Sequence, residues 1–360
     1  MSGTDVLQSG LGPIRSSTYL PADPGAVLWG RLPCETDSPV LTIDPGTEVT
    51  IDTISHEGIH EDQGRDPIAF FGGFGVKRDG VLRDAAALAA SDHPRDPAVD
   101  GVHVITGPIR VTGAMPGDLL KITVLENLPR VPYGIVSNRH GRGALPGEYP
   151  LDPGTVSVFA GIEGGILGSH GTMPRVLGGD HSVRFPLAPF LGIMGVAVRG
   201  SVRPHSVPPG PHGGNLDINL LTVGSALYLP VQVPGALAYF GDPHFAQGDG
   251  EVALTAMEGS LRSTMRFDVL TQAEAVAAFG EQVGPLAETE EFLIPSGLSE
   301  NLDEALKNCV RAAIALLQAR FGMDAAHAYA YLSAATDFNI SQVVDLVKGV
   351  HARIRVADFD

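Results

Sequence analysis

Short segments in which apolar and polar residues alternate are the feature that most constrains how this chain can fold. With a leading glycine, the pattern occurs three times, at residues 46–53, 117–124 and 224–231. A period of two indicates a strand with one buried face. Similar patterns lie at residues 102–112, 192–199, 235–240, 251–255 and 261–270. Many short strands separated by Gly/Pro turns favour a sandwich or barrel over a doubly wound parallel sheet, so we predict a mainly β fold.

The pattern changes after Pro295. Asn301 with Glu304 resembles the capping box that begins a helix, and Gly322 supplies its stop. The apolar residues at helical spacing between them are Leu302, Leu306, Cys309, Ala313 and Leu316. Two further helices are expected near residues 325–333 and 341–352. We therefore predict a C-terminal helical layer against the β body.

The length allows two lobes or one enlarged β domain, since 360 residues exceed a usual single domain. We predict a β-rich body over residues 1–295 and a helical segment over 296–360 packed on it. Within the body, the polar, glycine-rich stretch 55–101 interrupts the strand pattern and contains a short helix near 81–90. Such interruptions are commonly lids or functional loops; a plain surface excursion is the alternative.

The charge balance argues against polyanionic partners. The formal net charge is −17, so neither nucleic acid nor anionic lipid has an electrostatic reason to bind. The two cysteines, Cys34 and Cys309, match no disulfide or metal pattern, which fits a reducing cytoplasm. Residues 1–25 lack the basic start and apolar core of a secretion signal, and no apolar run is long enough to cross a bilayer. We expect a cytoplasmic protein.

The densest group of polar side chains lies at residues 241–251, between two strand patterns. We expect one short loop there, carrying Asp242, His244, Gln247, Asp249 and Glu251. Its glycines let the backbone approach a ligand, and loops on a rigid sheet commonly carry functional sites. The alternative is a solvated turn, although three acids, an imidazole and an amide rarely cluster without a function.

A second group lies at residues 211–217, immediately before a strand. Asn215 and Asp217 are two residues apart and would share one face of an extended chain. With His244 they could bind a divalent metal, because imidazole and carboxylate ligands suit zinc, iron or manganese. His103, at the start of another strand, is a third candidate ligand. The alternatives are a turn acid for Asp217 and a hydrogen-bonded core residue for His103.

Other catalytic signatures are weaker. Glu57 follows His56 and His181 follows Asp180, but neighbours on a strand face opposite ways, so neither pair acts as a dyad unless the backbone turns. The sequence has no Gly-x-Ser-x-Gly elbow and no phosphate-binding loop. Cys309 lies on the apolar stripe of the predicted helix, which argues against a catalytic cysteine.

These segments, taken in order, resemble the acetamidase/formamidase family. The resemblance rests on His103 with the following Thr-Gly-Pro-Ile, the turn 116–118, the stretch 208–218, and 241–251 followed by Ala256-Met-Glu258. It covers about residues 46–270, with weaker support near 328–344. It implies a mainly β fold with jelly-roll-like and barrel parts and an α/β portion. It also implies hydrolysis of short amides, zinc in part of the family, and a homo-oligomer, most simply a dimer.

The sequence departs from better-known members of that family at residues 55–66 and 133–190, and some relatives resemble lactamases that act on cyclic amides. The resemblance therefore leaves the acyl group of the substrate open.

Amide hydrolysis needs an activated nucleophile and a proton for the leaving nitrogen, and a metal ion can supply the first by lowering the pKa of bound water. The expected metal ligands are His103, Asp217 and His244, with zinc as the expected ion. The expected proton-transfer groups are Glu251, Asp249 and Glu57. The expected substrate-orienting groups are Asn215, Gln247 and His181. The alternatives are a cupin-like metalloenzyme, for which no His-x-His pair occurs, and a non-catalytic β-sandwich that binds a small molecule.

Overall fold

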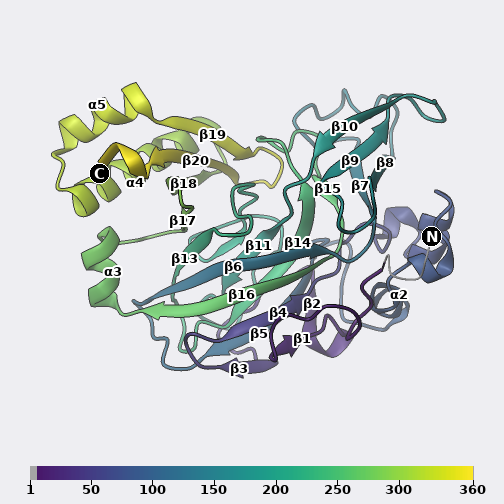
Figure 1. Ribbon diagram of the computed structural model, residues 1–360, viewed down its shortest axis with the longest axis horizontal. Helices are drawn as coiled ribbons and strands as arrows, with labels where there is room; N and C mark the ends of the chain where they lie inside the picture. Colours follow the sequence, from purple (N-terminus) through teal and green to yellow (C-terminus); the bar gives the residue numbers. More distant parts are fainter. Residues whose placement is uncertain (1–5, 360) are drawn as a thin grey trace.

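Two large β-sheets contain most of the regular structure in the computed structural model, which describes residues 6–359. Apolar side chains from both sheets share one core, across which the rings of Phe240 and Phe267 meet edge to face with centroids 5.7 Å apart. The prediction of a mainly β fold is confirmed, but within these residues both sheets are open and neither closes into a barrel (Figure 1). The first five residues of the polar segment 1–25 lie outside the described range.

The first sheet has nine strands, and its neighbours pair antiparallel except for β1 and β4, which run parallel. Strand β6 alternates buried and partly exposed residues over its first half, as the period of two predicts. In sheet order the strands are β1 (Tyr19–Leu20), β4 (Glu48–Asp52), β16 (Leu261–Leu270), β6 (Leu119–Pro129), β13 (Ala226–Pro230), β17 (Leu286–Glu288), β18 (Phe292–Ser299), β20 (Lys348–Arg355) and β19 (Asp337–Gln342).

The second sheet has eleven strands, eight of them in one continuous order. In that order they are β10 (Ser182–Pro186), β9 (His170–Pro174), β8 (Thr155–Ile162), β7 (Tyr133–Arg139), β15 (Met257–Glu258), β14 (Ala238–Ala246), β11 (Phe190–Val196) and β12 (Gly213–Asn215). The remaining three are β5 (Val104–Val111), which pairs with β14, and β2 (Val27–Trp29) and β3 (Leu41–Ile43), which pair with β5. Strands β11 and β14 are buried along almost their whole length, so polar residues on them face the interior.

The helices gather in two places. Near the start of the chain lie η1 (Pro24–Ala26), η2 (Glu61–Gln63), α1 (Pro67–Gly72), η3 (Arg78–Gly80) and α2 (Arg83–Ala90). Towards its end lie α3 (Gln272–Phe279), α4 (Leu302–Phe321), α5 (Ala325–Ala335) and η4 (Val356–Phe359). The predicted helices at 81–90 and 302–321 are thus confirmed. None of the helices in the described residues is long and apolar enough to span a bilayer.

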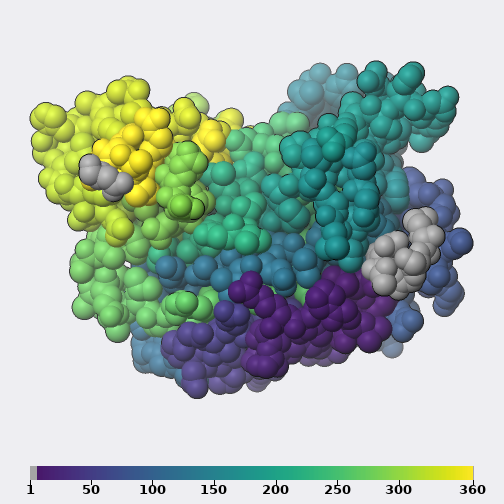
Figure 2. Space-filling view, in the orientation of Figure 1, coloured from purple at the N-terminus to yellow at the C-terminus, as the bar shows by residue number. Residues whose placement is uncertain are grey.

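The C-terminal helical layer is also confirmed. Asn301 caps α4 by accepting a hydrogen bond from the Glu304 amide, and Gly322 ends the helix in a left-handed conformation with φ 66°. The buried side chains of α3, α4 and α5 pack together with those of β13, β17, β18 and β20 in a second apolar core. In Figure 2 the surface dips between this layer, in yellow, and the part of the second sheet that holds β8, β9 and β10, in teal.

Two local predictions are wrong. Residues 341–352 form no helix but end β19, turn, and begin β20, which pairs with both β18 and β19. Residues 251–255 form a turn rather than a strand. Periodicity alone does not separate a short apolar helix from a strand, and here the available pairing partners decide.

The segment 55–101 lies between β4 and β5 and carries η2, α1, η3 and α2. Its apolar side chains Ile59, Leu82 and Leu88 are buried in the main core. The segment is therefore packed onto the β body and carries its first residues into the interior. A domain division near residue 295 and lid-like movement of this segment stay predictions.

Candidate active site and metal centre

Seven buried side chains with metal-binding chemistry converge from separate elements. Asp242 and His244 lie two residues apart on β14, and Glu258 on β15 is paired in register with His244. The other four flank strand ends: after β4, before β5, after β12 and after β14. The seven are His56, His103, Asp217, Asp242, His244, Glu251 and Glu258. The prediction that residues 241–251 form one loop is wrong, because β14 continues to Ala246.

The backbone is unusual at three of these acids. Asp217, Asp242 and Glu251 have φ values of 49°, 51° and 47°, in the left-handed region that side chains other than glycine seldom occupy. Each such residue costs on the order of 1–3 kcal/mol and persists where the surrounding structure enforces it, often at functional sites. Asp217 is thus not on an extended chain, which corrects the expectation that it shares a strand face with Asn215.

Gly192 on β11 provides the space for the cluster. A Cβ atom at this position would overlap side-chain atoms of Asp217, Asp242 and His244. Because the overlap involves three buried side chains with nowhere to move, only glycine fits without displacing the cluster. The absence of a side chain at residue 192 is therefore part of how the site is built.

The candidate ligand atoms form three overlapping sets: His56, His103 and Asp242; Asp217, His244 and Glu251; and Asp242, His244 and Glu258. Within each set they lie within 4.8 Å of one another. In the third set, Nε2 of His244 is 3.1 Å from both Oδ2 of Asp242 and Oε1 of Glu258. Two ligands of a tetrahedral zinc, each ~2.0–2.1 Å from the ion, lie about 3.3 Å apart. The spacing fits a shared cation.

Many polar atoms of the cluster have no hydrogen-bond partner among the described residues. Buried polar groups in proteins are almost always satisfied, so a group of unsatisfied atoms points to something absent from the protein chain itself. These atoms are Nδ1 of His56, Oδ1 of Asp242, both ring nitrogens of His244, both carboxylate oxygens of Asp217 and Oε2 of Glu258. Nitrogen and oxygen atoms of this kind are suitable ligands for zinc.

The two histidines of the first set are each held by a further residue. Nδ1 of His103 is 3.0 Å from the Ser206 hydroxyl, so its Nε2 faces Asp242 at 3.6 Å. Nε2 of His56 is 3.3 Å from Oε1 of Glu57, so its Nδ1 faces Asp242 at 3.6 Å. Metal-binding histidines typically hold their second nitrogen in this way. The arrangement leaves one nitrogen of each ring directed at the same carboxylate.

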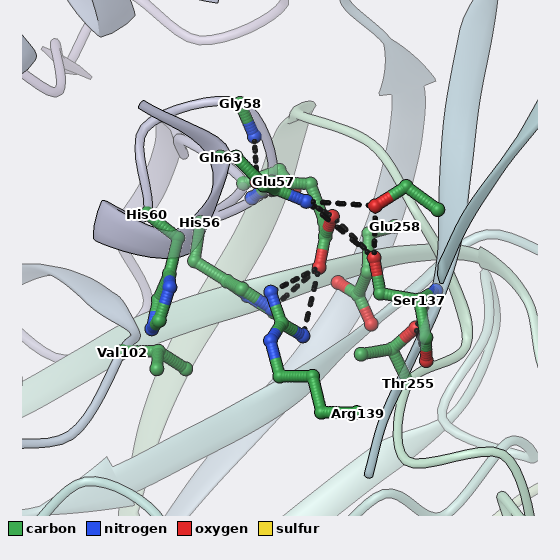
Figure 3. Close-up of polar contacts among 12 residues, drawn as sticks. His56, Glu57, Gly58, His60, Gln63, Val102, Ser137, Arg139, Thr255 and Glu258 are labelled. Carbon is green, nitrogen blue, oxygen red and sulfur yellow. Dashed lines mark hydrogen bonds and ion pairs between the residues drawn. The ribbon is translucent and has the colours of Figure 1, made fainter. Parts of the chain in front are cut away.

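Glu57 is itself fixed by a polar network (Figure 3). The Ser137 hydroxyl donates to its Oε2 at 2.6 Å, the Gln63 amide donates to the same oxygen, and Arg139 lies 3.4 Å from Oε1. His56 and Glu57 can pair because the chain turns after β4. On a regular strand, two neighbouring side chains would face opposite ways. Burial opposes ionisation of Glu57, but His56 and Arg139 together lower its pKa to about 2.

The protonation of the two histidines differs. Burial disfavours the charged form of His56, yet its interactions with Asp242 and Glu57 raise its pKa to about 10. For His103, burial dominates and lowers the pKa to about 4. His103 is therefore neutral at physiological pH, the form in which imidazole binds a metal. His56 is protonated there, so a bound metal would have to displace its proton.

The acids of the cluster repel one another. Burial and then the neighbouring Asp242 raise the pKa of Asp217 to about 7. Burial and then Asp217 raise the pKa of Glu251 well above its ordinary range, and the same causes raise that of Asp345, which lies in the turn between β19 and β20. Crowded carboxylates all ionise together only when a cation joins them. The charge distribution thus also favours a bound cation.

A cavity of about 190 Å³ borders the cluster. Its wall includes His56, His103 and Asp242, the complete first set, whereas neither of the other sets lines it completely. Asn215 also lines the cavity, is 2% exposed, and has an Oδ1 atom without a hydrogen-bond partner in the described chain. The first set is therefore the one that a molecule in the cavity would meet.

Several residues predicted from the sequence do come together. His103, Asp217, His244 and Glu251 belong to the cluster, although His103 lies in a different set from the others. Asn215 faces the cavity, and Glu57 supports His56.

The other predicted residues lie apart from the cavity wall. Asp249 is exposed and accepts hydrogen bonds from Asn219 and Asn339. The Gln247 amide donates to the backbone carbonyl of Asp217, and His181 is exposed between β9 and β10. These contacts give Asp249 and Gln247 a structural setting.

The sequence interpretation gave no role to four acids or imidazoles of the site: His56, Asp242, Glu258 and Asp345. Asp242 had a signal, since it precedes His244 by two residues on a strand. Glu258 stood in the motif Ala256-Met-Glu258, and His56 stood beside Glu57. The sequence around Asp345 gave no signal of a site, because these residues were expected to form a helix.

The fold and the site define a mainly β protein with a buried histidine and carboxylate centre beside a cavity. Residues 79–206 and 201–356 match the Acetamidase/Formamidase family, so the chain belongs to that family. It is 33% identical over 207 residues to an acetamidase of Mycolicibacterium smegmatis and 31% identical over 202 residues to a formamidase of Methylophilus methylotrophus. Each match covers 44% of this chain, and 51% and 49% of the relatives. The chain thus spans about half the length of these curated relatives.

A solved structure agrees over a longer stretch. The crystal structure of an acetamidase from Bacillus halodurans is similar with a TM-score of 0.72 and 25% identity, covering 95% of this chain and 98% of that one. The likeness therefore extends through both sheets and the C-terminal layer.

Proposed function

We propose that this protein hydrolyses a small carboxamide to a carboxylate and ammonium, at the set of His56, His103 and Asp242 in the presence of a divalent metal. One observation carries the proposal: this set borders a cavity large enough for a substrate and has a buried imidazole nitrogen and a carboxylate oxygen without hydrogen-bond partners in the described chain. The family relatives named acetamidase and formamidase support the amide as the substrate class.

Zinc is the ion that we propose. Two imidazoles and one carboxylate, with a further position open to the cavity, are typical of catalytic zinc sites. When bound, zinc supplies a Lewis acid that polarises the amide carbonyl and makes hydroxide available near neutral pH. Asp217 and His244, the other ligands expected from the sequence, lie behind this set and do not line the cavity.

The remaining steps fall to side chains of the cavity wall. The Oδ1 atom of Asn215 can accept a hydrogen bond from the substrate amide N–H and so orient the carbonyl carbon towards the histidines. Glu251 lines the cavity, and burial together with Asp217 raises its pKa, which favours its protonated form. Delivery of that proton to nitrogen lets the C–N bond break with ammonia rather than amide ion as the leaving group. We assign these two residues the orienting and proton-transfer roles.

Ammonia release from formamide, acetamide, longer amides and lactams tests the function directly. The protein is assayed as purified, after chelation, and after zinc is restored, with metal content measured in each sample. We expect activity to follow zinc content. Full turnover in metal-free protein would contradict the metal role, and amide binding without ammonia release would favour a binding protein instead.

A cytoplasmic location stays a prediction.

We also propose that the protein is a homodimer. Large apolar side chains are exposed near β8, β9 and β10, including Leu167 at 84% and Leu177 at 100%. Where exposed apolar side chains form one contiguous patch, the patch commonly marks an interface. Light scattering should give twice the chain mass, and Leu177→Asp should shift it towards the monomer. A monomeric mass for the unchanged protein would refute the dimer.

A further inference from the structure

Arginine gathers on the wall of the cavity. Arg95, Arg139 and Arg142 all line it, in a chain with 24 basic and 41 acidic residues. A protein with a net charge of −17 repels small anions over most of its surface. Three arginines at one cavity are therefore unexpected unless they serve the fold or a ligand, and the two roles differ in how the charges are paired.

Two of the three arginines are already paired within the protein. Arg95 forms an ion pair with Glu61 and donates to the carbonyl of Gly101 at 3.0 Å. Arg139 donates to Asp62 at 2.7 Å and lies 3.4 Å from Glu57. Both side chains are largely buried, at 3% and 13% exposure. Their charges hold the wall of the cavity together and leave little positive charge for a ligand.

Arg142 differs from both. It lies in the turn after β7, is exposed, and makes no side-chain hydrogen bond or ion pair with any of residues 6–359. Of the acids on the cavity wall, Asp100 is paired with Arg31 at 2.6 Å, and the others belong to the buried cluster or adjoin it. An exposed arginine without a partner among the described residues thus lines the same cavity as the buried histidines and acids.

The positive field there also acts on His205, another residue of the cavity wall. Burial and then Arg31 lower the pKa of this imidazole, and Arg142 contributes in the same direction. The effect of Arg142 on a neighbouring wall residue places its charge within electrostatic reach of the cavity.

The cavity is larger than the smallest amides need. Its volume of about 190 Å³ compares with a share of ~30 Å³ for one water molecule in the liquid. Formamide has only three heavy atoms, so it would leave most of this space to solvent. An amide with a longer acyl chain fills the cavity from the histidines outwards.

We propose that the preferred substrate is a monoamide of a dicarboxylic acid, whose free carboxylate is bound by Arg142 while its amide lies at the histidines. This inference rests on the proposed function. A guanidinium binds a carboxylate through two parallel hydrogen bonds, which gives orientation as well as affinity. In the reaction, water adds to the amide carbon, the C–N bond breaks, and the products are a dicarboxylate and ammonium.

The test compares the monoamides of malonic, succinic and glutaric acid with propionamide, butyramide and valeramide, using zinc-loaded protein. We expect kcat/KM to be about tenfold or more higher for at least one carboxylate-bearing amide, as a charge-assisted pair at a partly solvated site allows. Arg142→Gln should remove this preference, mainly by raising KM for the carboxylate-bearing amides. Arg311→Gln is the control, since Arg311 is exposed on α4 away from the cavity.

Direct binding separates this inference from the proposed function. Calorimetry with malonate, succinate and glutarate should detect binding that weakens in Arg142→Gln, in Arg142→Glu and at high salt. That result supports the carboxylate site even if no amide is hydrolysed. Equal kcat/KM for charged and neutral amides, with no effect of Arg142→Gln on rate or dicarboxylate binding, overturns the inference while leaving amide hydrolysis intact.

Discussion

The protein buries two groups of charged residues, and they are partnered in opposite ways. Around β4 and β16, Arg262 donates to both carboxylate oxygens of Asp52 at 2.7 and 2.9 Å, and Arg130 donates to Asp84 at 2.6 Å. Backbone carbonyls take the remaining arginine N–H groups, and no buried polar side-chain atom of these four lacks a partner within the described chain. The histidine and carboxylate cluster, by contrast, contains no lysine or arginine and many unsatisfied atoms.

The difference separates structural from functional charge. The arginine network neutralises itself with groups from the same chain, so it serves the fold. The cluster contains more carboxylates than its histidines can balance, which a fold alone would not retain, because unpaired buried acids cost stability. A buried charge without a partner inside the protein thus indicates where a partner from outside belongs.

The largest effect is expected on stability, from Arg130→Met. This change leaves Asp52 and Asp84 buried with one cation fewer, and removing one partner of a buried ion pair typically costs about 3–5 kcal/mol. Urea denaturation of metal-free protein measures the loss in unfolding free energy. Arg184→Met is the control. Arg184 lies on the exposed strand β10 and pairs with Glu163, so its loss should change the unfolding free energy little. An equal loss of unfolding free energy in Arg130→Met and Arg184→Met would contradict a structural role for the buried arginine network.

The next effect concerns Asp242→Asn, where the main loss should be in metal binding rather than in stability. Burial alone would raise the pKa of Asp242, but His244 and His103 hold it well below its ordinary range. Because this charge is attracted by the histidines as well as repelled by the other acids, the metal-free protein should lose less stability than Arg130→Met does. Zinc content and amide hydrolysis should both collapse, activity by more than the roughly 10–100-fold typical of a lost supporting residue. Metal analysis and ammonia release measure this. Stoichiometric zinc in the variant would contradict the assignment of Asp242.

A smaller effect is expected from Glu57→Gln, which keeps the shape of the side chain but removes the carboxylate beside His56. Zinc affinity should fall by roughly 10–100-fold while the fold persists. The matched control is Asp62→Asn: Asp62 also pairs with Arg139 but lies against His60 rather than a histidine of the first set. Competition with a chromophoric chelator gives both affinities. If Asp62→Asn weakens zinc as much, the effect is structural.

The smallest effect is expected from Asp249→Ala. Both carboxylate oxygens of Asp249 already accept hydrogen bonds, from Asn219 and Asn339, so this acid resembles the satisfied network rather than the cluster. Turnover should stay close to that of the unchanged protein, whereas Glu251→Gln should lower it by on the order of a hundredfold. A large loss of turnover from Asp249→Ala, with the fold intact, would mean that a satisfied acid can still be catalytic here.

Local patterns in the sequence predicted much of the fold. Strands such as 261–270 and the capped helix beginning after Asn301 depend on alternation and capping within a few residues. Residues 341–352 were predicted wrongly, because their strand state depends on pairing with β18, about fifty positions away. The arginine network was not predicted at all, since nothing local distinguishes Arg130 or Arg262 from a surface arginine.

The site was predicted in part for similar reasons. His103, His244 and Glu251 stand in recognisable motifs, whereas their distribution over three overlapping sets depends on how β5, β14 and β15 are paired. The left-handed conformation of Asp217 and the space above Gly192 have no signature in the sequence. They arise only when the strands are assembled.

The turn between β19 and β20 bears on the order in which the site is completed. It carries Val344 and Asp345 to the cavity wall, and hydrogen bonds between its flank and Gly250 tie it to the turn that holds Glu251. Chains fold as they are synthesised, the earlier parts first. The histidines and Asp242 therefore emerge from the ribosome long before this wall exists. A nascent chain would present a half-built, solvent-open pocket until its last strands pair, so metal loading can precede closure of the site.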